Sequence, residues 1–144
     1  MDSKPLEVEE LRKEVLDFSA GGYTSFEGWV RNLNEGKKVL RLEYQSYEVL
    51  AIKEGQKIVQ EALEKFDITK ARCVHRVGQL ELGQLAVWIG VSAEHRGPAF
   101  EACQYIINQV KIRVPIWKRE HYVDEDPQWV ECHHCAKHAN HAAT

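Results

Sequence analysis

The sequence has no long apolar run, no excess of basic residues and only four cysteines among its 144 residues. No stretch approaches the ~18 consecutive apolar residues of a membrane-spanning helix, so we expect no membrane segment. The formal net charge of −3 at pH 7 argues against a nucleic-acid binder, which usually carries a strongly basic face. The first ten residues are acidic and lack the apolar centre of a signal peptide, so we expect a cytoplasmic protein.

The four cysteines fall into two groups, and neither contains an obvious activated nucleophile. Cys73 and Cys103 lie in apolar, periodic segments and are expected to be small buried core residues. Cys132 and Cys135 lie near the C-terminus, and a cytoplasmic chain keeps such thiols reduced. His75 is likewise interpreted as a core residue rather than a ligand.

The remaining composition is that of an ordinary globular protein, with 44% apolar and 28% charged residues. Its length predicts a single domain over residues 1–131, followed by a flexible Cys/His-rich tail at 132–144. Apolar periodicity predicts helices over about 5–18, 49–66 and 98–113. Alternating segments predict strands over 23–31, 39–44, 72–77 and 85–91, the last two joined by a hairpin-like connection, and a closing hairpin of 116–123 and 128–131. The fold class is therefore α+β, with a mixed, mainly antiparallel sheet and helices packed on it.

His95 and Arg96 form the first candidate site. They precede Gly97-Pro98, and proline favours the first position of a helix, so both side chains should lie at a helix N-terminus. Unpaired backbone N–H groups and the helix dipole attract anions there, and an arginine adds a bidentate phosphate ligand. A solvated arginine beside a capping histidine is the alternative.

Lys111 and Lys118 form the second candidate site, on either side of Pro115. A lysine in a partly apolar setting, as Lys118 is beside Trp117, can serve as an acid or base, and a nearby cation assists. Lys111 could instead simply complement the dipole at the C-terminal end of a helix.

The spacing of these two sites has a consequence for assembly. Fifteen residues separate Arg96 from Lys111, which is ~22 Å along a helix at ~1.5 Å per residue. One small substrate does not bridge that length within one chain. A symmetric homodimer, in which a second copy completes the pocket, would bring the two ends together.

Five segments together carry a family resemblance. They are FEGWVRN (26–32), VHRVGQLELGQ (74–84), SAEHRGPAFEAC (92–103), VKIRVPIWKRE (110–120) and WVE (129–131). In this order and spacing they resemble the large, catalytic subunit of molybdopterin synthase, the MoaE family. The resemblance covers residues 22–131 and implies an α/β hammerhead-type fold.

The resemblance implies a sulfurtransferase that converts cyclic pyranopterin monophosphate to molybdopterin. Sulfur would come from the thiocarboxylated C-terminal Gly-Gly of a small ubiquitin-like subunit, so that no resident cofactor is required. The implied assembly is a homodimer within a heterotetramer. Lys111 and Lys118 are the implied catalytic residues, and the implied substrate-binding residues are Trp29, Val30, Arg31, His95, Arg96, Lys111, Lys118, Arg119 and Glu120.

Two other functions compete with this interpretation. The first is a non-enzymatic dimeric module for anion binding or assembly, which keeps the basic helix ends but needs no catalytic lysine. The second is metal handling by Cys132, Cys135, His138 and His141 in the tail. Structural zinc sites usually separate their ligand pairs by a longer loop, so we favour no metal site.

Overall fold

The structure is a computed structural model that describes residues 1–34, 36–122 and 128–131. In chain order its elements are α1 (Val8–Val15), β1 (Gly22–Trp29), β2 (Leu33–Asn34), β3 (Lys37–Ser46), α2 (Glu48–Lys65), β4 (Lys70–His75), β5 (Gly78–Glu81), β6 (Leu85–Ala93), α3 (Arg96–Arg113), β7 (Ile116–Tyr122) and β8 (Gln128–Glu131). The strand pairs are antiparallel, and an isolated bridge between Asp2 and Arg76 is parallel. The expected α+β class is confirmed.

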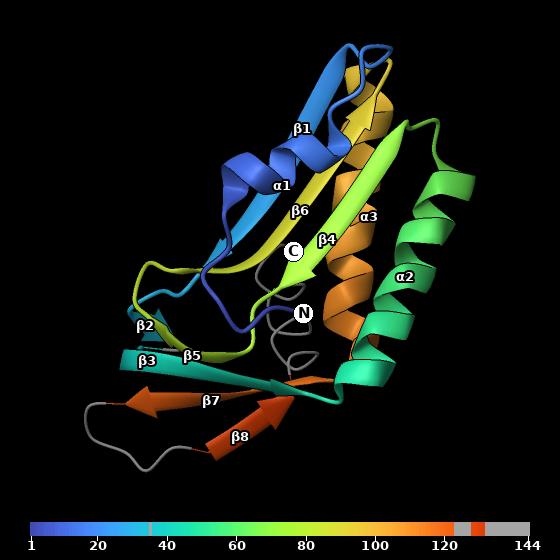
Figure 1. The fold of residues 1–144 in the computed structure, drawn as a ribbon. Coiled ribbons are helices and arrows are strands. Elements are labelled where there is room, and N and C mark those ends of the chain that lie inside the picture. Colours follow the sequence, from blue (N-terminus) through green and yellow to red (C-terminus); the bar gives the residue numbers. More distant parts are fainter. Residues whose placement is uncertain (35, 123–127, 132–144) are drawn as a thin grey trace.

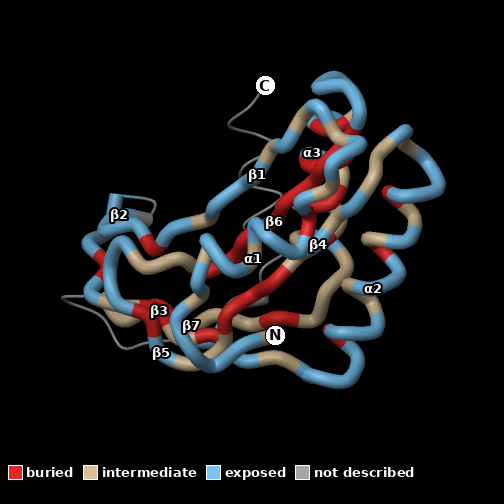
Figure 2. The backbone as a smooth tube through the Cα atoms, turned by 45° about the horizontal axis from the view of Figure 1, so that its top comes forward, coloured by how far each residue is buried: buried red, intermediate tan, exposed pale blue. Residues whose placement is uncertain are grey.

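The first sheet has the strand order β1–β6–β4, and helices cover both of its faces (Figure 1). α3 packs on β6 and β1, α2 packs on α3 and β4, and α1 contacts β6 and β4 from the opposite side. β6 is buried along its length, whereas the edge strand β1 is largely exposed (Figure 2). Among the described helices, none is long and apolar enough to cross a membrane.

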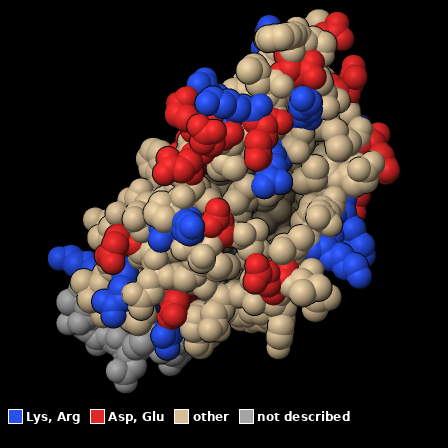
Figure 3. All heavy atoms as spheres, in the orientation of Figure 1, with Lys and Arg blue, Asp and Glu red and all other residues tan. Residues whose placement is uncertain are grey.

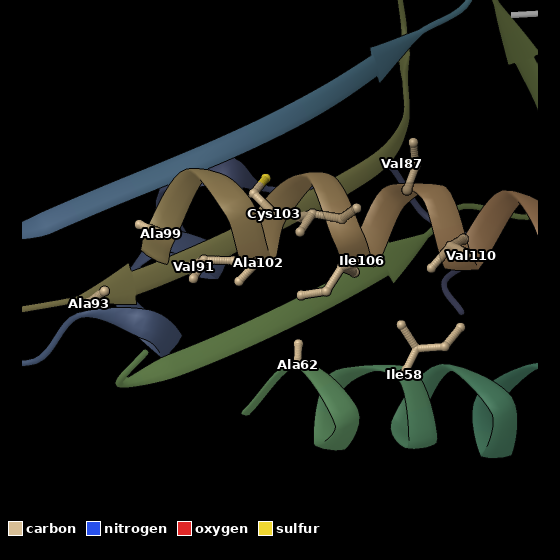
Figure 4. Packing of buried hydrophobic residues seen from close by; sticks show 11 residues of the cluster. Ile58, Ala62, Val87, Val91, Ala93, Ala99, Ala102, Cys103, Ile106 and Val110 are labelled. Atoms are coloured by element: carbon tan, nitrogen blue, oxygen red, sulfur yellow. The ribbon is translucent and has the colours of Figure 1, made fainter. Parts of the chain in front are cut away.

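The core between the first sheet and its two long helices depends on strand alternation in β6 (Figure 4). Every second residue of this strand faces α2 and α3, because successive side chains point to opposite faces of a sheet. Small residues of α3 let the helix lie close to the sheet. The buried members are Ile58, Ala62, Val87, Ile89, Val91, Ala93, Ala99, Ala102, Cys103, Ile106 and Val110.

The other face of β6 carries Trp88, the largest fully buried side chain, packed across Gly90. A Cβ atom at Gly90 would lie 2.3 Å from the Trp88 ring, so only glycine fits there. α1 covers this face and buries Val15.

The second sheet has β3 at its centre, with β7 on one side and β2 and β5 on the other. β8 pairs with β7, which confirms the predicted closing hairpin; its turn lies outside the described residues. The expected antiparallel pairing of β4 with β6 is confirmed, but the connection between them is not a simple hairpin turn. Residues 78–81 form β5 and cross to β3, because Leu80, with no exposed surface, anchors them in the second core.

Two helix predictions also need correction. The first helix ends at Val15 rather than Phe18, because the Asp17 carboxylate accepts hydrogen bonds from the backbone N–H and hydroxyl of Ser19 and forms a turn. In α3, the helical spacing of Phe100 from Cys103 predicts a core position for Phe100, but its side chain is exposed and the neighbouring Ala99 is buried.

Candidate functional site

The N-terminus of α3 presents His95 and Arg96 to solvent, as the sequence predicts. His95 is the N-cap residue in an extended conformation, its side chain makes no capping hydrogen bond, and the first turn contains no acidic residue. A Cβ at Gly21 would lie 2.8 Å from the Glu94 carbonyl oxygen, so the glycine allows this close approach. This helix end therefore has the backbone donors and the arginine that an anion site needs.

Lys118 lies on the buried face of β7, where it forms a 2.6 Å ion pair with Glu120. Their side chains are only 13% and 6% exposed. Tyr122, two residues further along the same face, donates a 2.5 Å hydrogen bond to the other carboxylate oxygen of Glu120. The result is a buried row of a cation, a carboxylate and a phenol, which we call the Lys118–Glu120–Tyr122 row.

Arg119 lies on the opposite face of β7, because neighbouring strand residues alternate in direction. Its guanidinium contacts Glu43 Oε1 at 2.5 Å and lies 4.9 Å from the centre of the Trp129 ring. Within one chain, Arg119 therefore does not share a face with Glu120, although both were expected to line one pocket.

Lys111 lies near the C-terminal end of α3 and forms no ion pair or hydrogen bond with any described residue. Its charge acts on His75 at the end of β4, whose pKa is lowered to about 3, first by complete burial and then by Lys111. His75 is therefore neutral near pH 7, and its Nδ1 contacts the Arg76 carbonyl oxygen at 2.8 Å.

Tyr44 lies between His75 and the strand that carries Lys118. The Tyr44 and His75 rings meet edge to face, with centroids 4.8 Å apart. Tyr44 also lies directly opposite Lys118 in the register between β3 and β7. The charge of Lys111 thus acts on His75, whose ring meets Tyr44, the strand partner of Lys118.

The segment 29–31 reaches the apolar cluster of the second sheet from β1. Val30 is buried in one cluster with Tyr44 and Ile116. Its backbone N–H donates a hydrogen bond to the carbonyl of Gln84, and its carbonyl accepts one from the N–H of Gly83. Trp29 and Arg31 on either side of it are exposed. The expected pocket position of Val30 is consistent with this burial, whereas its role in substrate binding stays a prediction.

A cavity of about 690 Å³ opens between α1, α2 and β4. It can be followed in Figure 3 as a hollow beside charged side chains of α1. Residues 71–75 of β4 and Gly55 with its neighbours on α2 line it, as do Val110, Val114 and Ile116. Val110 is the residue before Lys111 in α3.

The described cysteines are unsuited to act as nucleophiles. Burial raises the pKa of the Cys73 thiol to about 12 and that of Cys103 to about 11, so both are protonated at neutral pH. Within the described residues, no three His, Cys, Asp or Glu side chains are grouped to hold a metal ion. The suggested ligands Cys132, Cys135, His138 and His141 lie outside the described residues.

Sequence reasoning missed Tyr122 and Tyr44 as members of this site. The signal for Tyr122 was present, because residues 118, 120 and 122 share one face of a strand. Tyr44 depends on the pairing of β3 with β7, which is not readable from the local sequence.

An α+β domain with His95 and Arg96 at one end of a helix, Lys111 near its other end and Lys118 on the next strand has the cations of a protein that binds an anionic substrate. The family profile described as MoaE protein matches residues 1–113. The molybdopterin synthase catalytic subunit of Pyrococcus abyssi is 47% identical over 124 residues, covering 86% of this chain and 83% of the relative. The chain therefore belongs to the MoaE family, and its function is that of the catalytic subunit of a molybdopterin synthase.

Solved structures agree with this assignment. The crystal structure of molybdopterin synthase from Staphylococcus aureus has a TM-score of 0.85 and 36% identity, covering 90% of this chain and 93% of that one. A chain in the protein–protein complex of subunits 1 and 2 of the molybdopterin-converting factor from Helicobacter pylori has the same fold, with a TM-score of 0.74. It is 21% identical, and the match covers 90% of this chain and 88% of that one.

Proposed function

We propose that the junction of the two sheets is the sulfur-transfer site and that Lys111 and Lys118 carry the reaction. Cyclic pyranopterin monophosphate would bind with its phosphate at Arg31, His95 and Arg96. Lys118 would act on the substrate as acid or base, and Lys111 would meet the thiocarboxylate. The observation that carries this proposal is that both lysines are linked to the ring pair of His75 and Tyr44. The Lys111 charge lowers the pKa of His75, and Lys118 lies opposite Tyr44 in the register between β3 and β7.

The electrostatics of the reaction favour such a site. A substrate phosphate and a thiocarboxylate are both anions, and their approach is unfavourable unless cations offset the repulsion. Lys111 has no ionic partner among the described residues, so its charge is available to an incoming anion. A neutral His75 beside it adds no competing charge. Because the sulfur arrives on the partner, the proposed reaction needs no resident cofactor and no cysteine of this chain.

The partner proposed is a small ubiquitin-like subunit that ends in a Gly-Gly thiocarboxylate, in keeping with the two-subunit complex from Helicobacter pylori. The cavity beside β4 would offer its C-terminus a route, because Val110, the residue before Lys111, is one of the residues that line it. Gly55 supports this route. Glycine inside a helix is unfavourable, yet among the described residues no atom lies within 4 Å of a Cβ built at this position, so packing within the chain does not require it. An incoming backbone would use the space that this glycine leaves.

The His95-Arg96 pair of the same chain is too far from the lysines to share their substrate. α3 separates Arg96 from Lys111 by fifteen residues, or ~22 Å. We therefore propose that a second copy supplies His95 and Arg96 to each pocket. Two large and two small subunits then form a heterotetramer, which we place in the cytoplasm.

Single substitutions test the proposed site. Lys118→Ala and Lys111→Ala should each abolish most molybdopterin formation from cyclic pyranopterin monophosphate and a thiocarboxylated partner, with unchanged far-UV circular dichroism. Lys13→Ala, which removes an exposed lysine on α1, is the matched control and should keep wild-type turnover. If both lysine variants turn over normally, these lysines are ordinary structural cations and the site lies elsewhere. Retained partner binding without any turnover in the wild type would favour the non-enzymatic assembly module.

A further inference from the structure

Tyr122 is the last residue of the Lys118–Glu120–Tyr122 row, and the two outer residues of the row determine the orientation of the Glu120 carboxylate. Residues two apart on a strand point to the same face, so Glu120 has Lys118 on one side and Tyr122 on the other. One carboxylate oxygen contacts the lysine ammonium at 2.6 Å, and the other accepts the phenol hydrogen bond at 2.5 Å. Each oxygen of the Glu120 carboxylate therefore has its own partner, and the two contacts together fix the orientation of the carboxylate.

The surroundings make this geometry matter. Glu120 is 5% exposed and lies opposite the buried Leu42, while Tyr122 packs against the same apolar cluster. Ion pairs and charge-assisted hydrogen bonds are stronger in such a setting than in water, and they depend more on orientation. If the Glu120 carboxylate rotated, its oxygen would leave the Lys118 ammonium and the ion pair would be lost.

We propose that Tyr122 is a positioning residue for sulfur transfer, because its hydroxyl fixes Glu120 in the orientation that holds the Lys118 ammonium at the substrate. Tyr122 itself does not touch the substrate. The inference rests on the role proposed above for Lys118, and it adds a residue that lies beyond the family-like segment ending at residue 120.

The central variant is Tyr122→Phe, which removes one hydroxyl and keeps the ring in the apolar cluster. We expect kcat to fall about tenfold, the change that a loss of one well-oriented hydrogen bond produces. KM for cyclic pyranopterin monophosphate should stay within about twofold, because the lysine is misplaced for the chemical step rather than for uniform binding.

Tyr105→Phe is the matched control. Tyr105 donates a 2.6 Å hydrogen bond to Glu61, which is paired with Arg113, so this second row has the same chemistry away from the site. Its loss should lower the melting temperature without changing kcat. A fall in kcat of equal size in both variants would overturn the proposal, since general loosening would then explain it.

A double-mutant cycle separates action through Glu120 from direct action. If Tyr122 works through Glu120, adding Tyr122→Phe to Glu120→Gln should lower kcat no further. If the two substitutions instead lower kcat independently, so that their effects multiply, the phenol does not act through Glu120 and the proposal is overturned. Wild-type kcat in the Tyr122→Phe enzyme would also overturn it.

A spectroscopic readout covers the case in which variant activity is too low to analyse. In ¹⁵N-lysine NMR of the protein, the Lys118 ammonium signal should persist in wild type and Tyr105→Phe and broaden in Tyr122→Phe. An unchanged signal overturns the proposal. The proposed function fails separately: activity in Lys118→Ala would refute it, whereas an inactive Lys118→Ala with a normal Tyr122→Phe refutes only the role of Tyr122.

Discussion

Arg113 and Glu61 join the ends of α3 and α2 through two parallel hydrogen bonds, of 2.6 and 2.9 Å. Arg113 also bonds Glu54 at 2.7–2.8 Å, and these carboxylates raise the pKa of its guanidinium. The same contacts, with the Tyr105 hydroxyl, hold the pKa of Glu61 at about 2. Arg113 is therefore engaged in holding two helices together, although it lies two residues from Lys111.

Arg113→Ala should consequently act on stability and leave catalysis intact. The lost contacts are partly exposed, so we expect the free energy of unfolding to fall by about 1 kcal/mol. The checks are urea denaturation for stability and sulfur transfer at a temperature where the variant is folded. A kcat reduced as strongly as in Lys111→Ala would show that Arg113 belongs to the site.

The sequence predicted the elements that local patterns determine. The N-terminus of α3 follows from Gly97-Pro98, and the β7–β8 hairpin follows from alternation and turn residues. The position of β5 did not follow, because its partner β3 lies more than thirty residues away in the chain, and no local preference encodes that pairing.

The sequence also did not show which of the four cations in residues 111–119 form ion pairs within the chain. Arg113 and Arg119 lie beside the candidate lysines in the sequence, and glutamates 52 and 76 residues away bind them. Lys118 is likewise paired, with Glu120 two residues away, whereas Lys111 has no ionic partner among the described residues. The local sequence did not reveal the partners of the two arginines, because these carboxylates are distant in the chain.

The stability of the protein should fall as pH falls from about 6.5 to about 3, in part because of His75. The folded state keeps His75 neutral, with a pKa of about 3, whereas the unfolded chain binds a proton near pH 6.5. Between these values the unfolded state holds more protons, so acid favours unfolding by up to ~1.4 kcal/mol per pH unit for one group.

His75→Gln removes this contribution, so the free energy of unfolding should depend less steeply on pH. The measurement is urea denaturation of both proteins between pH 6.5 and 4.5. Glu61, whose pKa the folded state lowers from 4.5 to about 2, begins to contribute near the lower limit and does so equally in both proteins. His121, whose pKa burial also lowers, contributes to both proteins and cancels in the comparison. Equal slopes for the two proteins would show that His75 is not buried in neutral form.

Gly55 provides a paired test of the cavity. Gly55→Ala should raise the free energy of unfolding by about 0.5–1 kcal/mol, because alanine is the better helix former and meets no described atom. Gly55→Trp fills the cavity and should weaken partner binding at least about tenfold, the effect of losing ~1.4 kcal/mol of binding free energy. Urea denaturation measures the stability of Gly55→Ala, and isothermal titration with the small subunit measures the affinity of Gly55→Trp. Wild-type affinity in a folded Gly55→Trp protein would place the partner's C-terminus elsewhere.

Removal of residues 132–144 should leave assembly and sulfur transfer unchanged. These residues follow the family-like segments, and their composition offers few large apolar groups for docking. Size-exclusion chromatography and the transfer assay check the truncated chain. Loss of activity on truncation, together with one zinc per chain in the full-length protein, would make the tail a functional metal site.

The proposed sharing of each pocket between two copies predicts complementation between inactive variants. Arg96→Ala chains keep Lys118, and Lys118→Ala chains keep Arg96. In a mixed dimer one pocket joins the two intact residues, and the other joins the two substituted ones. Equal mixing with free exchange should therefore restore about one quarter of the wild-type pockets, since about half of the dimers are mixed and each has one intact pocket.

The experiment requires proof that subunits exchange. Differently tagged chains are mixed, the mixed dimer is isolated through both tags, and its sulfur transfer is compared with that of each parent. A mixed dimer of Lys111→Ala and Lys118→Ala chains is the control, because both lysines belong to the same side of the pocket and no pocket is made whole. Activity near half of the wild type in the first dimer, and none in the second, is the expected result. An inactive first dimer would mean that Arg96 and Lys118 of different chains do not meet, so that the ~22 Å helix separates two independent sites.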